Sequence, residues 1–338
     1  MKSELTRQIF EAFALGDKEK FLAAAREIIN EEEKKSHRLF AKDLREIIKS
    51  LGNGSSMAEI PSTKRYKDSI PIPRDSEKGF PLLEVKEFHL DWNDLILEES
   101  VKSSLKQIVE EIRQAEVFAT YGLKPKQCVL FCGPPGTGKT LSSQIISSVL
   151  YFPLVYVRFD SIVSSFLGET ASNLRKIFDF IERGEWVVLF DEFDFIGKQR
   201  DDPYEHGEIK RVVNNFMQML DGFSGDSLII AATNHQYLLD PGLWRRFDEI
   251  IHFDLPDLSL RKNLLMKYLG VMEKQKDLAY DLIVKELNKF SPADIAHVCW
   301  DALKKAILDN RRTVTNQDLL LAIKEQKRRK QIEKKKDG

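Results

Sequence analysis

Cysteine, net charge and long apolar runs are all scarce in this sequence, and each scarcity removes a class of protein. Three cysteines occur among 338 residues, none at metal-ligand spacing, which excludes a disulfide scaffold and indicates reduced thiols in a cytoplasmic protein. No apolar stretch approaches the roughly 18 residues of a membrane span, and the N-terminus lacks the apolar core of a signal peptide. We therefore expect no membrane association. The formal net charge of -1 provides no general attraction to nucleic acid, although the segment from Lys324 to Lys336 is strongly basic.

A glycine-rich octapeptide follows the apolar run from Cys128 to Cys132 and opens a stretch with helical periodicity. In this context backbone N–H groups surround a β-phosphate at a helix N-terminus. Lys139 is expected to reach the β- and γ-phosphates, and the Thr140 hydroxyl to bind Mg²⁺. The octapeptide comprises Gly133, Pro134, Pro135, Gly136, Thr137, Gly138, Lys139 and Thr140. The sequence therefore predicts a site for a nucleoside triphosphate, and an accidental glycine-rich turn is the weaker interpretation.

Two adjacent carboxylates end a second apolar run. Residues 186–190 are continuously apolar, which is typical of a buried parallel strand, and Asp191 and Glu192 follow them. Ligands of an open α/β sheet collect at the carboxyl ends of its strands. We therefore expect Asp191 to hold Mg²⁺ and Glu192 to polarise the water that attacks the γ-phosphate. The alternative for Glu192 is a solvated acid at a strand end.

Strand and helix patterns alternate through the middle of the chain and give way to helices after Phe253. Apolar runs at 129–131, 154–157, 187–190 and 228–232 alternate with helical stretches, which predicts a doubly wound parallel sheet of the α/β class. Helices are predicted at 260–269, 278–287, 292–308 and 316–327, as a lid over the nucleotide. The predicted domains are a helical N-terminal module (1–51), a linker or extended arm (52–89), an α/β nucleotide-binding domain (90–255), a helical lid (256–327) and a basic tail (328–338).

Further segments in the same order and spacing resemble the AAA+ ATPases, whose fold is a P-loop NTPase domain with a helical lid. They are residues 164–170, 216–222, 231–234, 239–248 and 291–294, so the resemblance covers about Asp91 to Lys327. The resemblance is to the group with proteasomal ATPases, membrane-anchored AAA proteases and microtubule-severing ATPases. In that group an Ala-Asp pair, here Ala293 and Asp294, replaces the sensor-2 arginine.

The resemblance implies roles for residues on either side of the bound phosphate. Asn234 is similar to sensor 1, which orients the attacking water; a turn asparagine is the alternative. Arg245 and Arg246 resemble arginine fingers that reach the γ-phosphate of a neighbouring subunit, and a surface salt bridge is the alternative for either. They are adjacent here, whereas many relatives separate them by Pro-Gly, so the dominant finger stays open. Fingers that act in trans imply a homo-oligomeric ring, expected to be a hexamer.

The resemblance also implies contacts with a polypeptide client and with the base. Phe166, Leu167 and Gly168 align with an aromatic loop that lines the central pore of protein-threading relatives, where apolar contact grips any polypeptide. A second pore loop is expected at 201–207. For adenine, the expected slot comprises Ile96 and Leu97, together with the turn near Gly122.

The favoured function is an ATP-driven protein remodeller or unfoldase with ATP and Mg²⁺ as cofactors. No His-Glu-x-x-His motif is present, so proteolysis would need a partner. Residues 207–213, 234–235 and 244–247 look like those of short bacterial AAA ATPases encoded beside subtilisin-like serine proteases, including pairs linked to phage defence. The alternatives are a DNA-associated ATPase, which the basic tail would support, and a nucleotide-gated scaffold without hydrolysis.

Overall fold

The computed structural model describes residues 2–14, 17–34, 44–45, 70–75, 79–158, 167–193, 206–238, 241–274 and 278–334. Two helices, α1 (Lys2–Ala14) and α2 (Lys18–Lys34), pack against each other at the N-terminal end. Their contact buries Leu5, Ala12 and Ile29, which agrees with the helical module predicted at the N-terminus. Most of the remainder of that module, up to residue 51, lies outside the described residues. Within the described ranges, no helix combines the length and apolarity needed to cross a membrane.

The central feature is a six-stranded sheet among the described residues, with the strand order β1-β3-β4-β5-β2-β6. Every neighbouring pair is parallel except β1 and β3, which run antiparallel. The strands are β1 (Glu84–Lys86), β2 (Cys128–Cys132), β3 (Leu154–Arg158), β4 (Val187–Asp191), β5 (Leu228–Thr233) and β6 (Glu249–His252). The predicted parallel α/β sheet is confirmed, and its four central strands are the four apolar runs of the sequence.

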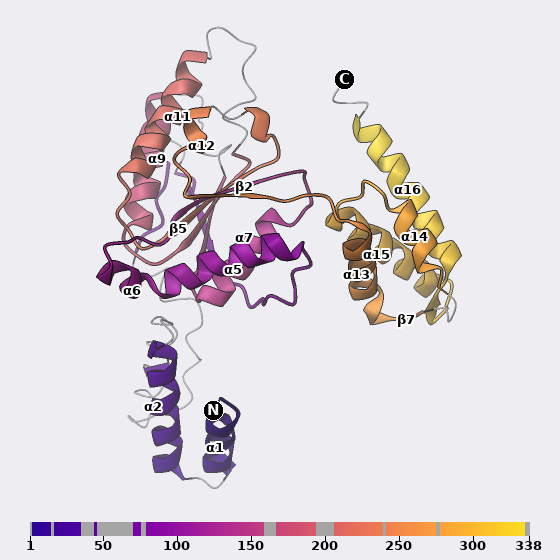
Figure 1. Cartoon of the computed structure of the whole chain (residues 1–338), viewed down its shortest axis with the longest axis horizontal. Helices are drawn as coiled ribbons and strands as arrows, with labels where there is room; N and C mark the ends of the chain where they lie inside the picture. Colours follow the sequence, from indigo (N-terminus) through magenta and orange to yellow (C-terminus); the bar gives the residue numbers. More distant parts are fainter. Residues whose placement is uncertain are drawn as a thin grey trace.

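Helices cover both faces of this sheet (Figure 1). The helices whose residues belong to the cores against the sheet are α5 (Glu99–Arg113), α7 (Lys139–Leu150), α9 (Leu167–Ile181), α11 (His206–Asp221) and α12 (Pro241–Trp244). The short elements α6 (Ala115–Thr120), which has no buried residue, and η1 (Gln236–Leu238) lie in the connections. Strand side chains alternate between two cores: Leu130 and Phe190 pack with α9 and α11, whereas Val129 and Leu189 pack with α5 and α7. Both faces are apolar, which is why the central strands read as continuous apolar runs.

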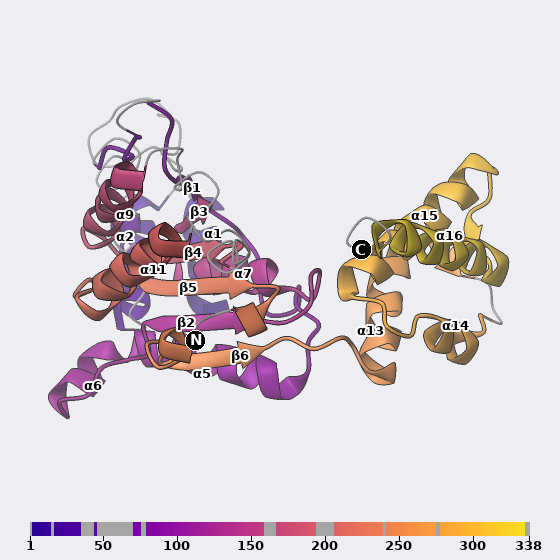
Figure 2. The same ribbon diagram turned by 90° about the horizontal axis from the view of Figure 1, so that it is seen from above.

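A helical lid follows β6 and stands beside the sheet domain in both views (Figures 1 and 2). Its elements are α13 (Leu258–Tyr268), η2 (Leu269–Val271), β7 (Glu273–Lys274), α14 (Tyr280–Glu286), α15 (Pro292–Leu308), β8 (Thr313–Val314) and α16 (Asn316–Lys334). These helices enclose their own core, which includes Leu265, Ile283, Val298 and Leu319. The four predicted lid helices are therefore present.

Three details differ from the pattern predicted by the sequence. Strand β1 lies within the range predicted as a linker, where it pairs with β3. The lid, predicted to be purely helical, contains the two-residue pairing of β7 with β8. Helix α16 runs on to Lys334, past the predicted start of the basic tail, and its Lys327, Arg329 and Lys330 form ion pairs with acids of the lid.

Candidate active site

The glycine-rich loop lies where the carboxyl end of β2 meets the N-terminus of α7, as the sequence predicted. Gly133, Gly136 and Gly138 all have positive φ, at 138°, 74° and 106°, and Gly138 is the residue that caps α7. Such angles favour glycine, because a side chain is strained there. The loop therefore combines an unusual backbone path with the positive end of a helix, the combination that binds phosphate groups.

The Lys139 side chain is held inside this loop. Its ammonium group donates hydrogen bonds to the carbonyls of Gly133 at 2.6 Å and Pro134 at 2.8 Å, and the residue is only 7% exposed. A lysine this deeply buried keeps its charge only where polar partners surround it. The fixed position places a positive charge within the concave side of the phosphate loop.

The carboxylate of Asp191 at the end of β4 reaches the first turn of α7. The Thr140 hydroxyl donates to Asp191 Oδ2 at 3.1 Å, which brings together the two predicted Mg²⁺-binding side chains. The next residue, Glu192, is exposed and has a φ of 54°. Its backbone N–H donates to Asp191 Oδ1 at 2.9 Å. A non-glycine residue with positive φ is strained, and such strain concentrates at functional sites.

Asn234 comes directly after β5, the strand next to β4 in the sheet. The ends of the two strands are tied together, because the N–H of Phe193 donates to the carbonyl of Ala232 at 2.9 Å. Asn234 is half-buried, and the preceding Thr233 accepts the N–H of His235 at 3.0 Å. Asn234 thus lies at the same edge of the sheet as Asp191 and Glu192, where a sensor residue is expected.

The lid touches the phosphate loop through the start of α15. The N–H of Ala293 donates to the carbonyl of Gly136 at 3.1 Å, and a side chain at Gly136 would meet Ser291 Oγ at 2.7 Å. Ser291 and Asp294 form a capping box at the start of α15. Burial opposes ionisation of Asp294, but hydrogen bonds from Lys330, Ser291 and Gln326 outweigh it and lower the pKa of this carboxyl.

The residues of the predicted adenine slot lie in two separate parts of the structure. Leu97 lies 3.8 Å from the position of a side chain on Gly138, and Ile96 packs against the core of the lid. These two residues therefore sit between the phosphate loop and the lid. The turn at Gly122 precedes the amino end of β2, whereas the phosphate loop follows the carboxyl end of that strand. The inclusion of this turn in the slot was therefore wrong.

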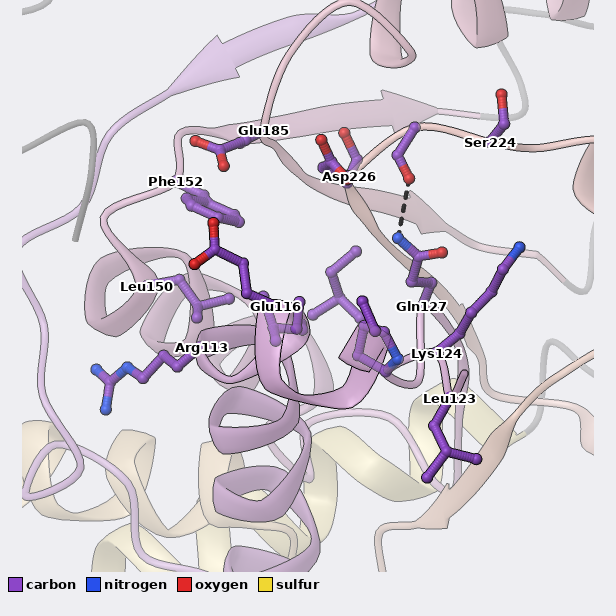
Figure 3. A pocket seen from close by; sticks show the side chains of 17 residues that line it. Arg113, Glu116, Leu123, Lys124, Gln127, Leu150, Phe152, Glu185, Ser224 and Asp226 are labelled. Atoms are coloured by element: carbon purple, nitrogen blue, oxygen red, sulfur yellow. Dashed lines mark hydrogen bonds between the residues drawn. The ribbon is translucent and has the colours of Figure 1, made fainter. Parts of the chain in front are cut away.

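A cavity lies beside that turn, next to the amino ends of β2, β4 and β5, and Figure 3 shows the side chains that line it. Its volume is about 340 Å³. Leu123 and Lys124 line it, together with Phe152 and the acids Glu116 and Asp226. The phosphate loop follows the carboxyl end of β2, so this cavity is separate from the candidate active site.

Arg245 and Arg246 lie near the amino end of β2, away from the chain's own phosphate loop. Asp248, two residues on, accepts the N–H of Cys128, the first residue of β2, at 2.8 Å, and Phe247 is buried in the core. Both arginines are exposed, and Arg246 contacts Asp221 at 3.4 Å. The weak salt bridge to Asp221 leaves the alternative of a surface ion pair open for Arg246.

Several predicted residues cannot be placed. Phe166 and most of the second predicted pore loop, residues 201–205, lie outside the described residues. Leu167 and Gly168 begin α9, without described side chains. The aromatic pore loop therefore stays a prediction.

Among the described residues, Tyr156 belongs to this site but was not predicted from the sequence. Its hydroxyl donates to Asp191 Oδ2 at 3.1 Å. Tyr156 belongs to no motif, and the only available signal was a polar aromatic side chain within an apolar strand.

The residues present fit a nucleotide with its metal ion. The glycine loop, the buried ammonium of Lys139 and the helix N-terminus match a polyphosphate, and the oxygens of Thr140 and Asp191 are the hard ligands that Mg²⁺ prefers. Fold and site together define a P-loop nucleotide-binding protein. The sequence model of one protein family, the ATPase family associated with various cellular activities (AAA), matches residues 129–255 of this chain.

A relative extends this match over nearly the whole chain. The uncharacterized AAA family ATPase y4kL of Sinorhizobium fredii is 36% identical over 331 residues, covering 97% of this chain and 96% of that protein. The chain belongs to the AAA family of ATPases, and this membership implies ATP hydrolysis.

Proteasome-activating nucleotidases are further relatives. That of Saccharolobus islandicus (strain Y.N.15.51) is 37% identical over 235 residues, which are 67% of this chain and 60% of the nucleotidase. That of Sulfurisphaera tokodaii is 32% identical over 286 residues, 82% of this chain and 72% of the nucleotidase. The match to the first thus spans less than two thirds of its length.

Proposed function

We propose that this AAA ATPase is Mg²⁺-dependent and works as a homo-oligomeric ring, a hexamer, that pulls on polypeptide clients. The observation that carries the proposal is the hydrogen bond from the Thr140 hydroxyl to Asp191, at 3.1 Å. It lies beside the phosphate loop, and that loop is in contact with the lid. This pair of side chains supports a Mg²⁺ site, and the contact of the lid with the loop provides a route by which hydrolysis moves one part of the chain against another. The three buried free cysteines suit the reducing cytoplasm.

In the proposed chemistry each residue has one task. Lys139 and the loop N–H groups bind the phosphates and neutralise their charge. Asp191 and Thr140 would hold the Mg²⁺, which supplies further charge neutralisation when bound. Glu192 accepts a proton from the attacking water, and Asn234 orients that water. The strained backbone at Glu192 supports this assignment, because φ there is 54°.

The positions of Arg245 and Arg246 support a ring. They lie near the amino end of β2, whereas their own phosphate loop follows its carboxyl end. An arginine so placed would complete the site of a neighbouring subunit. In the proposed ring the predicted pore loop at Phe166, Leu167 and Gly168 grips the client, and the pair α1–α2 docks it.

A subtilisin-like serine protease is the proposed partner for clients that are degraded. The sequence resemblance at 207–213, 234–235 and 244–247 is what supports it. Its test is to mix the protein with the protease encoded by a neighbouring gene and to follow degradation of a folded substrate. Degradation that requires ATP is expected, whereas equal degradation without ATP would remove the partner from the proposal.

The main test measures ATP hydrolysis with unfolded protein, with double-stranded DNA and with neither. We expect unfolded protein to stimulate hydrolysis and DNA to leave it unchanged. The result is compared with Glu192→Gln, which should bind ATP with unchanged affinity but hydrolyse it roughly 10² to 10⁴ times more slowly.

Two outcomes would contradict the proposal. Stimulation by DNA alone would favour the DNA-associated alternative. The basic side chains Lys327, Arg329 and Lys330 of α16 offer that alternative little support, because they form ion pairs with acids of the lid. Hydrolysis by Glu192→Gln at the rate of the parent protein would remove Glu192 from its role. Glu325→Gln is the matched control, because Glu325 is an exposed acid on a lid helix.

A further inference from the structure

Three hydrogen-bond donors fix both oxygens of the Asp191 carboxylate. The backbone N–H of Glu192 donates to Oδ1 at 2.9 Å. The hydroxyls of Thr140 and Tyr156 both donate to Oδ2, each at 3.1 Å. Two of these donors belong to the phosphate loop and the strand end, where the motifs of the sequence place them. The third comes from a different strand, and no motif includes it.

The parallel register of β3 and β4 explains how Tyr156 reaches Asp191. Tyr156 pairs with Leu189, and Asp191 lies two residues further along β4. Side chains two residues apart share a face of the sheet, so Tyr156 and Asp191 are diagonal neighbours within reach of a long aromatic side chain. The flanking Val155 and Val157 point to the other core.

The Tyr156 ring is itself held in position. It packs against the core between the sheet and helices α5 and α7, and it is half-buried. The ammonium group of Lys86 on the neighbouring strand β1 lies over the ring, 5.7 Å from its centroid. A ring confined from two sides keeps its hydroxyl at one place, so the hydrogen bond to Asp191 restricts how the carboxylate can turn.

We propose that Tyr156 is a positioning residue for the Mg²⁺ site. This inference rests on the proposed function, in which Asp191 binds the metal. Mg²⁺ demands near-ideal octahedral geometry, and hydrogen bonds that orient a ligand typically change metal affinity by about 10- to 100-fold. The phenol donates without adding charge, so Asp191 keeps the full negative charge that the metal requires.

The test substitutes Tyr156→Phe, which removes the hydroxyl and keeps the ring. A fluorescent ADP analogue is titrated first in EDTA and then at increasing Mg²⁺ concentrations. We expect unchanged affinity in EDTA, and a Mg²⁺ concentration for half-maximal tightening that is raised roughly 10-fold. The matched control is Tyr121→Phe, because Tyr121 is 78% exposed and lies beyond α6. It should behave as the parent protein does.

Two results for the variant would overturn the inference. An unchanged Mg²⁺ requirement would mean that the hydroxyl does not orient the metal ligand. Weaker binding in EDTA by the same factor would mean that the hydroxyl acts on the nucleotide or the fold and not through Asp191. Failure of the proposed function looks different, since Mg²⁺ would then leave the parent protein's own affinity for the analogue unchanged.

Discussion

Gly133 stands where the main chain leaves β2 for the phosphate loop, and a side chain has no room there. Its φ is 138°, and a Cβ atom would lie 2.2 Å from the carbonyl oxygen of Phe253. Phe253 belongs to the segment that leads from β6 into the lid, and its N–H donates to the carbonyl of Cys132 at 2.8 Å. One glycine therefore sets both the path of the loop and the approach of the last strand.

Gly133→Ala should therefore impair both stability and nucleotide binding. The clash involves two backbone segments, so relief requires one of them to shift. We expect the free energy of unfolding to fall by about 1 to 3 kcal/mol, together with a loss of affinity for ATP. Denaturant unfolding and a fluorescent nucleotide measure the two effects.

The control for this substitution is Gly270→Ala in the lid, where a Cβ would meet nothing within 4 Å. It should bind nucleotide as the parent does. Equal behaviour of the two alanine variants would show that the contact with Phe253 imposes no constraint.

At the scale of elements, the start of α16 depends on a buried carboxylate. Asp318 is 4% exposed and accepts hydrogen bonds from Arg311 Nη1 at 2.6 Å and Nη2 at 2.7 Å, and from the hydroxyl of Thr315 at 2.7 Å. The Arg311 hydrogen bond, with those from Thr315, lowers the pKa of Asp318 to about 2. The carboxylate form therefore stabilises the folded lid.

Stability from Asp318 should be lost as the pH falls. The folded pKa of about 2 lies below the unfolded value of about 3.9, so the contribution is complete above pH 4 and disappears toward pH 2. We expect Asp318→Asn to lower the free energy of unfolding at pH 7 by about 2 kcal/mol. Unfolding curves from pH 7 to pH 2 should show that this difference shrinks. A difference that stays constant with pH would contradict the assignment.

The strands that the sequence predicted and those that it missed differ in burial. The central strands are apolar throughout because helices cover both faces. The edge strands β1 and β6 are short and contain exposed polar residues, such as Glu84, Lys86 and His252, so no apolar run marks them. Ser291 caps α15 together with Asp294, and Thr315 caps α16 together with Asp318, each pair three residues apart. Such short-range patterns can be read in the sequence, so the lid helices that they begin were predictable.

The candidate site divides in the same way. The phosphate loop and Asp191 follow from contiguous motifs, whose geometry is fixed by a few neighbouring residues. Tyr156 depends on the register between two strands. Gly122 was misplaced although it precedes β2 and the phosphate loop follows that strand, because no contiguous motif marks the residues that approach the base. Contacts set by tertiary packing therefore escaped prediction.

At the scale of the whole molecule, the proposed ring can be tested by mixing two inactive variants. Glu192→Gln lacks the proposed base, and Arg246→Ala lacks a proposed finger but keeps its own Glu192. In a mixed ring, some sites combine the intact Glu192 of one subunit with the intact Arg246 of its neighbour. We expect ATP hydrolysis to reappear on mixing, at a fraction of the parent rate.

Two observations would remove the ring from the proposal. One is the absence of any recovery when the mixed variants are shown to assemble together. The other is normal hydrolysis by parent protein shown to be monomeric during the assay. Normal hydrolysis by Arg246→Ala would instead assign the finger to Arg245, and the mixing experiment would be repeated with Arg245→Ala. Lys262→Ala is the matched control for Arg246→Ala, because it also removes an exposed cation but lies on α13, away from the proposed finger.

The anchoring of α16 has a practical consequence for handling the protein. Lys330 and Gln326 hold Asp294, and the adjacent Ala293 is bonded to Gly136 of the phosphate loop. A bulky fusion or surface attachment at the last turns of α16 would disturb this chain of contacts and with it the affinity for ATP. Fluorophores and immobilisation tags meant to be inert should therefore be attached elsewhere.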